Sequence, residues 1–275
     1  MTALHTLDAP MVRASVTYTV RTGSKPVSET GGADGMLRNY AGQFARHEVE
    51  ITDGRRAGGP YGLETSGFEL ADHPTRMRDF YDPDELRAVY YPEMQRLIAE
   101  RSGAVRVEIF DHTLRTSDED ARAKRKIREP VKVTHNDYTH WSGPQRLRDI
   151  LPHEAEALLG RRMAIVQTWR AINRTIERHP LAMIDARSIA PADLIAAERR
   201  FPDRVGEIYH LDYNPAHRWT YFPHMRRDEA LVFKVYDSDE GGRARWCPHT
   251  SFDDPTTPPG APPRESIEIR AFAFF

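Results

Sequence analysis

The second half of the chain is a run of short, β-rich segments, and this run limits the folds that are open to it. From residue 131 onward eight of them follow one another: VKVTHND, MAIVQTW, LAMIDA, GEIYHLDY, RWTYFPHM, EALVFKVYD, RARWCPHTSF and ESIEIRAFAFF. Turn-forming residues such as Asn214-Pro215 and the stretch PTTPPGAPP separate them. Closely spaced short strands with turns between them indicate an antiparallel sandwich or barrel. We favour a jelly roll, with a generic β-sandwich as the alternative.

The first hundred residues predict a strand, an irregular region and a helix. Residues 11–20 alternate and are rich in branched side chains, which is typical of a strand. Residues 22–70 are rich in Gly, Arg and polar residues and predict irregular structure. Residues 82–100 predict a helix, because Pro83 suits a first helical turn and apolar residues recur at helical spacing. The apolar stripe consists of Leu86, Val89, Tyr90, Met94, Leu97 and Ile98.

The middle of the chain is expected to lead into the β-rich half. Residues 105–110 predict a short strand, and the polar run after them predicts a solvated loop. The basic cluster at residues 122–126 could contact nucleic acid, but acidic residues directly precede it and favour the loop. Two helical intervals are expected within the β-rich half, around residues 151–159 and 191–198.

Length and composition favour one elaborated domain. The 275 residues are close to the upper limit for a single hydrophobic core. We therefore expect one domain over residues 1–275, mainly β with flanking helices. Residues 105–275 would form the jelly-roll core, and residues 1–104 would form an N-terminal extension whose strand and helix pack on it.

Charge and cysteine content exclude several classes of protein. A net charge of −2 shows no general bias towards nucleic acid or anionic membranes. With Cys247 as the single cysteine, the chain has neither a disulfide framework nor a cysteine zinc site. The N-terminus lacks the pattern of a secretory signal, and no apolar stretch reaches the ~18 to 20 residues needed to span a bilayer. We therefore expect a cytoplasmic protein without a membrane or nucleic-acid partner.

A histidine and an aspartate stand two positions apart at the start of the β-rich half. On a strand, positions two apart share a face, so His135 and Asp137 project together. A histidine from a distant strand would complete a set of two histidines and one carboxylate. Such a set holds ferrous iron on one side and leaves positions open for a cosubstrate and dioxygen. His249, on the second-last segment, is our candidate for the third ligand.

A second pair of the same kind, His210 and Asp212, competes with this assignment. In the jelly-roll oxygenase pattern, the pair lies on an early core strand and the second histidine on the penultimate strand. His135, Asp137 and His249 fit that order, whereas His210 and Asp212 lie mid-sheet. One difficulty remains, since five strand-like segments separate the two metal-binding segments where the pattern has four. We expect one of the five to be an inserted hairpin or loop.

An arginine and a serine, Arg264 and Ser266, begin the last segment and would share one face of a strand. Guanidinium presents a planar fork of donors that binds a carboxylate through two bonds, and a serine hydroxyl can add a third. Such an anchor suits the distal carboxylate of 2-oxoglutarate. The alternative is a surface arginine in a salt bridge. The upstream His249 and the pair His135 and Asp137 favour the cosubstrate anchor.

The motifs of the second half resemble a known family. The segments HNDYTHWSGPQRLRDILP, QTWRAI, PLAMIDARS, YNPAHRWTYFP, DEALVFKVYDS and PHTSFDDPTTPPGAPPRESIEIRAFAFF are similar to the CmcJ/AsaB-like hydroxylase/desaturase family. The resemblance runs from about residue 105 to the C-terminus. It implies a cupin-like double-stranded β-helix core, iron(II) bound by His135, Asp137 and His249, and 2-oxoglutarate bound by Arg264. It also implies dioxygen as cosubstrate and hydroxylation or desaturation of a small molecule of secondary metabolism.

Other residues are weaker candidates for the pocket. We expect Gln167 and Ser266 to assist in binding the cosubstrate. Residues expected to contact the substrate are Tyr138, Trp169, Arg170, Arg218 and Tyr221, although a role in the core is the alternative for each. The stretch DYTHWSGPQR is a candidate lid. The apolar end AFAFF suits a core strand better than a dimer contact, so a homodimer stays open.

Two other functions are compatible with the same fold. One is a cupin-type metal dioxygenase or isomerase that uses no 2-oxoglutarate, for which Arg264 would not matter to cosubstrate binding. The other is a binding protein without activity. The intact set of metal-binding residues argues against this second alternative.

Overall fold

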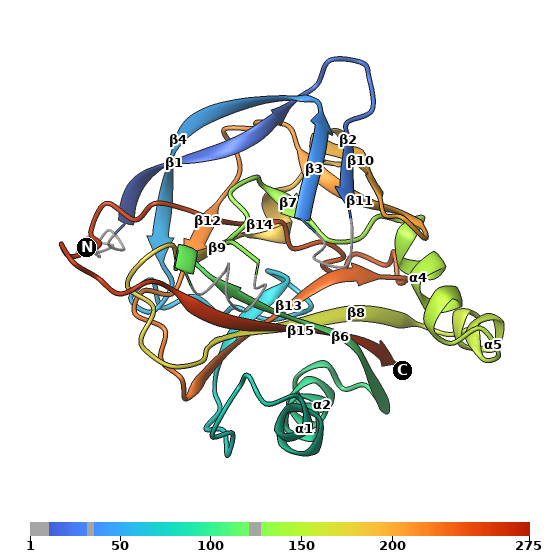
Figure 1. The fold of residues 1–275 in the computed structure, drawn as a ribbon. Coiled ribbons are helices and arrows are strands. Elements are labelled where there is room, and N and C mark those ends of the chain that lie inside the picture. Colours follow the sequence, from blue (N-terminus) through green and yellow to red (C-terminus); the bar gives the residue numbers. More distant parts are fainter. Residues whose placement is uncertain (1–10, 32–35, 121–127) are drawn as a thin grey trace, which may run out of the picture.

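The computed structural model describes residues 11–31, 36–120 and 128–275, which fold into two facing β-sheets with helices at the periphery (Figure 1). The larger sheet has the order β1 (Met11–Val20), β4 (Gln43–Asp53), β12 (Trp219–Tyr221), β9 (Leu181–Ile184), β14 (His249–Ser251), β7 (His135–Asn136), β11 (Val205–Leu211), β10 (Leu194–Arg200), β2 (Val27–Gly31) and β3 (Met36–Ala41). The smaller sheet has the order β5 (Phe68–Asp72), β13 (Glu229–Asp237), β8 (Met163–Ala171), β15 (Glu265–Phe274) and β6 (Arg106–Thr116).

The connectivity confirms the predicted jelly roll. Successive strands β6, β7, β8 and β9 alternate between the two sheets, and β12, β13, β14 and β15 do the same. The strands β10 and β11 pair with each other as an antiparallel hairpin and extend the larger sheet beyond β7. When this hairpin is set aside, four strands separate β7 from β14. The extra strand-like segment between the two metal-binding segments therefore belongs to an inserted hairpin, as expected.

The prediction of irregular structure for residues 22–70 is wrong. This region contains the four strands β2, β3, β4 and β5, which add to both sheets. Strand β4 pairs with β1 over its whole length, and its side chains alternate between exposed and partly buried. One face of β4 meets solvent and carries Arg and Glu, so its low hydrophobicity hides the strand pattern.

The helix predicted over residues 191–198 is also wrong. A single 3-10 turn spans Pro191–Asp193, and β10 begins at Leu194. Ala and Glu favour a helix locally, but hydrogen bonding to β11 outweighs that preference. The interval around 151–159 does contain a helix, α5 (Ala155–Leu159). It follows α4 (Ser142–Ile150), which forms part of the stretch that we expected to be a lid. The basic cluster at 122–126 lies outside the described residues.

The predicted helix after residue 82 is confirmed. Asp82 caps it by accepting bonds from the backbone N–H groups of Asp84 and Glu85. The helix then runs through α1 (Pro83–Glu85), a π-helical turn η1 (Leu86–Tyr90) and α2 (Tyr91–Ser102). It ends at Gly103, whose φ of 74° is left-handed and favours glycine. The predicted apolar stripe packs on the outer face of the smaller sheet, and no helix in the described residues has the length and hydrophobicity to span a membrane.

Alternate residues of β8 and β15 face opposite sides of the smaller sheet. Val166 and Ile269 belong to the cluster under α2, whereas Ile165 and Phe272 belong to the cluster between the sheets. The inward-facing row of β15 also carries the buried polar residues Ser266, Glu268 and Arg270, and the buried Arg264 directly precedes the strand. Buried charges are costly unless they are paired or bind a ligand. This row therefore marks the interior between the sheets as a candidate site.

Replacing Ile98 by alanine tests how much the helix contributes to stability. Ile98 is fully buried in the cluster under α2, so its loss leaves a cavity. We expect the free energy of unfolding to fall by about 2–5 kcal/mol in chemical denaturation. Arg87, which is exposed on the same helical segment, supplies the control, and Arg87→Ala is expected to change stability by less than about 0.5 kcal/mol. Equal effects of the two substitutions would contradict this assignment of the buried face.

Candidate metal and cosubstrate site

The larger sheet brings His135 and His249 together. Strands β7 and β14 are neighbours, and His249 lies directly opposite His135 in their register. The two imidazole rings have centroids 4.7 Å apart. Asp137 follows β7, and its Oδ1 lies 3.6 Å from Nε2 of His135. All three side chains are buried, so residues more than a hundred positions apart share one small volume.

Backbone carbonyl groups orient both imidazoles. Nδ1 of His135 lies 2.8 Å from the carbonyl oxygen of Val133, and Nδ1 of His249 lies 3.0 Å from that of Cys247. A carbonyl accepts only, so each Nδ1 carries the proton and donates it. Each Nε2 then has a free lone pair. Burial and the neighbouring His249 lower the pKa of His135 to about 3, so its imidazole is neutral at neutral pH. Neutral imidazole is the form that binds metals.

Asp137 is held from one side by two donors. Gln167 Nε2 donates to its Oδ2 over 2.6 Å, and Arg270 Nε donates to the same oxygen over 3.2 Å. Burial alone would raise the pKa of Asp137, but the charge of Arg270 holds it well below the usual range. Asp137 is therefore ionised, and its Oδ1 remains directed towards His135.

These donors fit a ferrous ion chemically. Two neutral imidazole nitrogens and one carboxylate oxygen form the set that non-haem iron(II) oxygenases use. In the described part of the chain, no three His, Cys, Asp or Glu side chains form a closed metal-binding group. The fold brings two histidines and one aspartate close together. A hydrogen bond to another atom of each side chain orients it, and the two Nε2 atoms and Oδ1 of Asp137 are the candidate metal-binding atoms.

Gln167 offers a test of this arrangement. We expect Gln167→Leu to weaken iron(II) binding by about 10- to 100-fold, because an orienting bond to a ligand carboxylate is lost. Anaerobic iron titration measures the effect. Thr168 is equally buried but faces the helix side, where it contacts Met94, so Thr168→Val is the matched control. If Gln167→Leu binds iron as tightly as the unchanged protein, Asp137 does not depend on this bond.

Arg264 is buried and lines a small cavity together with His135 and His249. Its Nη1 donates to the carbonyl of His179 over 2.7 Å and to Oγ of Ser251 over 3.3 Å. Its Nε donates to Oγ of Ser266 over 3.2 Å, as the shared strand face predicts. Burial, followed by the repulsion of Arg115, lowers the pKa of Arg264 to about 9, which leaves it charged at neutral pH. Among the described residues no carboxylate forms an ion pair with it.

A small cavity links Arg264 to the two histidines. Its lining includes His135, His249, Trp169, Ser251 and Arg264. The indole N–H of Trp169 is buried and has no partner among the described residues. An unpaired guanidinium and an orphaned N–H donor both favour a carboxylate ligand. These donors suit a carboxylate, and Glu268 and Arg115 also line the cavity.

The remaining predicted pocket residues divide into two groups. Tyr138 lines a second hollow, on the Asp137 side, and burial raises its pKa to about 12. Arg170 points to the opposite face of β8, where it contacts the carbonyl of Arg227 and Nδ1 of His73. Arg218 pairs with Asp185 over 3.3 Å, and Tyr221 packs against Phe252. The structure therefore does not place these last three residues at the metal neighbourhood.

The competing pair, His210 and Asp212, is engaged elsewhere. His210 lies opposite His135 across β11 and β7, but its Nδ1 bonds to Oγ1 of Thr19 over 2.9 Å. Asp212 instead accepts from Nε of Arg21 over 3.3 Å. The two side chains are thus directed to different partners, which favours the assignment of the first pair.

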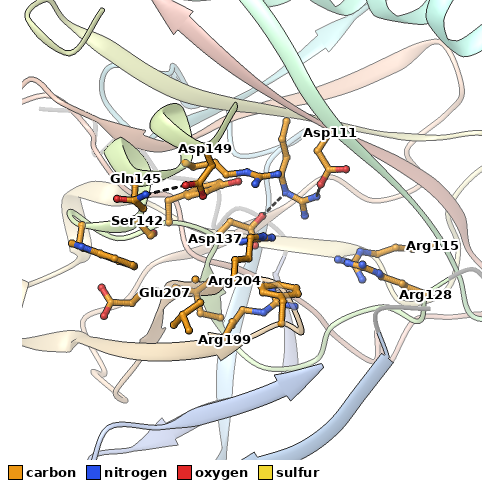
Figure 2. A pocket seen from close by; sticks show the side chains of 18 residues that line it. Asp111, Arg115, Arg128, Asp137, Ser142, Gln145, Asp149, Arg199, Arg204 and Glu207 are labelled. Carbon is orange, nitrogen blue, oxygen red and sulfur yellow. Dashed lines mark hydrogen bonds and ion pairs between the residues drawn. The ribbon is translucent and has the colours of Figure 1, made fainter. Parts of the chain in front are cut away.

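Sequence reasoning missed Arg270 and the charged hollow near it. Arg270 contacts Asp137, Asp111 and Glu268, and so connects β15 to the candidate metal ligands. The alternation of polar residues along β15 after Arg264 was a usable signal. Figure 2 shows the hollow, in which Asp137 lies among several arginines contributed by different elements. Their convergence could not be seen from spacing, because the arginines lie far apart in sequence.

Comparisons with known proteins identify relatives of the chain. Residues 16–274 match the family described as "Oxidoreductase/YMDC permease-like domain". The hydroxylase/desaturase CTB9 of Cercospora beticola is 31% identical over 267 residues, which cover 89% of this chain and 81% of CTB9. The alpha-ketoglutarate-dependent dioxygenase phiK of Fungal sp. (strain ATCC 74256) is 30% identical over 243 residues, which cover 85% of this chain and 87% of phiK.

Among solved structures, the iron and alpha-ketoglutarate-dependent endoperoxidase NvfI has the same fold. It superposes with a TM-score of 0.84 and 23% identity, over 96% of this chain and 98% of NvfI. The predicted resemblance to a hydroxylase/desaturase family is thereby confirmed. The chain belongs to the oxidoreductase family defined by the matched domain, together with the hydroxylases/desaturases and alpha-ketoglutarate-dependent dioxygenases related to it.

Proposed function

We propose that the protein is an Fe(II)- and 2-oxoglutarate-dependent oxygenase that acts on a small molecule. In this proposal His135, Asp137 and His249 hold the iron, and Arg264 binds the distal carboxylate of 2-oxoglutarate. The single observation that carries it is the cavity that joins both histidines to an arginine without an ion-pair partner among the described residues. The names of CTB9, phiK and NvfI support the same chemistry.

The chain's own residues position the reactants. The carbonyls of Val133 and Cys247 fix the imidazoles so that both Nε2 atoms are available. Gln167 and Arg270 keep Asp137 ionised and oriented. Arg264, with Ser266 and Trp169 nearby, would hold the cosubstrate away from bulk water. When bound, iron and 2-oxoglutarate supply dioxygen activation coupled to oxidative decarboxylation, which permits oxidation of an unactivated C–H bond.

The different names of related proteins argue for a shared core reaction with different outcomes. CTB9 is named a hydroxylase/desaturase and NvfI an endoperoxidase. All of these outcomes require one substrate bond to be aimed at the metal while water is excluded. For this chain we propose hydroxylation or desaturation, with the outcome set by the pocket on the Asp137 side.

Anaerobic titration tests the proposal. Addition of iron(II) and 2-oxoglutarate to the metal-free protein is expected to produce a visible charge-transfer band, and admission of air is expected to release succinate. A cupin-type enzyme that uses no 2-oxoglutarate would bind iron without producing the band. A binding protein without activity would release no succinate, and either result would count against the proposal.

A further inference from the structure

The hollow on the Asp137 side is rich in arginine. It has a volume of about 120 Å³ and is lined by β6, β15, α4, β10, β11 and the segments next to them. Six of its residues are arginines: Arg115, Arg128, Arg146, Arg199, Arg204 and Arg270. Figure 2 shows Arg199 and Arg204 on one side of Asp137, and Arg115 with Arg128 on another. A molecule in this hollow would lie next to a proposed metal ligand.

Only one of the six arginines has carboxylate partners within the described chain. Arg270 bonds to Asp137, Asp111 and Glu268. With the residues that the structure describes, the other five form no ion pair. Arg115 donates to the carbonyl of Glu129 over 3.0 Å, which leaves most of its N–H groups without a bond.

Aromatic rings contact three of these arginines, namely Arg146, Arg199 and Arg204. Arg204 lies 4.0 Å and Arg199 lies 5.6 Å from the ring centre of Phe201. Arg146 lies 5.5 Å from the ring centre of Phe110. A cation over a ring uses the face of the guanidinium, and its N–H edge remains available for an acceptor. The aromatic rings thus hold Arg146, Arg199 and Arg204 in place and leave their N–H groups available to a ligand.

The acids that line the same hollow already have partners. Asp111 and Asp137 accept from Arg270. Asp149 accepts from Gln145 Nε2 over 2.9 Å, and Glu207 accepts from Thr139 Oγ1 over 2.6 Å and pairs with Lys25 over 2.5 Å. The partner of Asp149 is a neutral amide, so the negative charge of Asp149 acts on Arg204. The hollow therefore carries six arginines against four acids, which leaves an excess of positive charge.

Arg115, Arg128 and Arg199 line the same hollow, and their charges affect one another. Burial lowers the pKa of Arg199 to about 10; Asp137 opposes this lowering, whereas Arg270, Arg115 and Arg128 add to it. Burial likewise lowers the pKa of Arg115; Glu268 and Asp137 oppose this lowering, whereas Arg270 and Arg128 add to it. Like charges gathered in a partly buried site destabilise each other, and a bound anion removes that repulsion.

The position of Arg199 favours the substrate over 2-oxoglutarate as this anion. Arg264 and its cavity adjoin His135 and His249, whereas Arg199 lines the hollow that contains Asp137. Arg199 also lies on β10, in the hairpin inserted between β9 and β12 and therefore outside the eight-strand core. Arg115 lines both the Arg264 cavity and the arginine-rich hollow, so its position does not distinguish 2-oxoglutarate from the substrate as the bound anion.

We propose that the substrate is a carboxylate-bearing small molecule, bound through its carboxylate by Arg199 together with Arg128 and Arg115. This inference rests on the proposed function and specifies its substrate class. The planar fork of guanidinium matches a carboxylate through two parallel bonds. Arg146 and Arg204, which line the same hollow, would add to the attraction for such an anion.

The test measures binding to the anaerobic Fe(II)·2-oxoglutarate enzyme by calorimetry. The probes are trans-cinnamate and indole-3-acetate, each compared with its primary amide, which has the same shape without the charge. We expect each carboxylate to bind at least about tenfold more tightly than its amide. Arg199→Gln should remove about tenfold of the carboxylate affinity and leave amide binding unchanged, and Arg199→Lys should retain part of it.

Arg200 supplies the matched control because it follows Arg199 on the same strand but is exposed. Arg200→Gln is expected to bind all four probes as the unchanged protein does. Arg204→Gln provides a second variant in the same hollow, with a smaller expected loss of carboxylate affinity. If neither carboxylate binds better than its amide, or if Arg199→Gln keeps full carboxylate affinity, the proposal is overturned. The charge-transfer band, recorded before each probe is added, tests the proposed function separately.

Discussion

Replacing His249 by alanine is expected to abolish iron binding and all turnover. His249 would supply one of three protein ligands, and its Nε2 has no other partner among the described residues. Loss of an outer partner of a ligand costs about 10- to 100-fold in metal affinity, and loss of a ligand itself should cost more. Anaerobic iron titration, followed by addition of 2-oxoglutarate, measures the loss directly through the absence of the charge-transfer band.

The same substitution at His210 discriminates between the two histidine–aspartate pairs. His210 is also buried and lies on the strand next to β7, but it bonds to Thr19. His210→Ala should therefore keep the band, and thermal unfolding should establish that both variants are folded. If His210→Ala loses iron while His249→Ala retains it, the assignment of the metal ligands is wrong.

The core of the fold was predictable because its strands carry strong local signals. Strands β8, β13 and β15 are buried on both faces and read as nearly continuous apolar runs. Strands β2 to β5 were missed because they lie at sheet edges or face solvent, where polar residues are tolerated and alternation is weak. In β10 the helix-favouring residues were overruled by pairing with β11, which no local pattern reveals.

The candidate site divides in a similar way. His135 and Asp137 could be paired from the sequence because a strand period of two fixes their relation. Arg264 and Ser266 could be paired for the same reason, and their contact confirms the shared face. The contact between Arg270 and Asp137 joins two strands in different sheets, and the arginine hollow joins several elements. Contacts between elements that are distant in sequence produce no periodic pattern in the sequence.

Arg170 illustrates the limit of the same reasoning. A charged residue at the end of an apolar strand suggested the interior between the sheets, but Gln167 and Trp169 already occupy that face. Residues one apart on a strand point in opposite directions, so Arg170 faces the helical side of the sheet instead, and its guanidinium lies 5.3 Å from the ring centre of Tyr90 in η1. The prediction thus placed Arg170 on the wrong face of the strand.

Replacing Arg264 by alanine is expected to raise the 2-oxoglutarate requirement steeply while iron still binds. Arg264 is the buried cation of the cavity that adjoins the two histidines. Removing one partner of a buried, hydrogen-bonded charge pair costs about 2–5 kcal/mol, which raises the half-saturating 2-oxoglutarate concentration by at least about 30-fold. Succinate release measured against 2-oxoglutarate concentration gives this value, and anaerobic titration gives the iron affinity.

Two further results make the Arg264 prediction specific. Arg264→Lys keeps the charge but loses the fork that now reaches His179, Ser251 and Ser266, so its half-saturating concentration should lie between those of the unchanged protein and Arg264→Ala. Iron affinity should be the same in all three proteins, since the hydrogen bonds of Arg264 go to His179, Ser251 and Ser266 and not to the proposed metal ligands. An unchanged 2-oxoglutarate requirement in Arg264→Ala would place the cosubstrate elsewhere and favour a metal enzyme that does not use it.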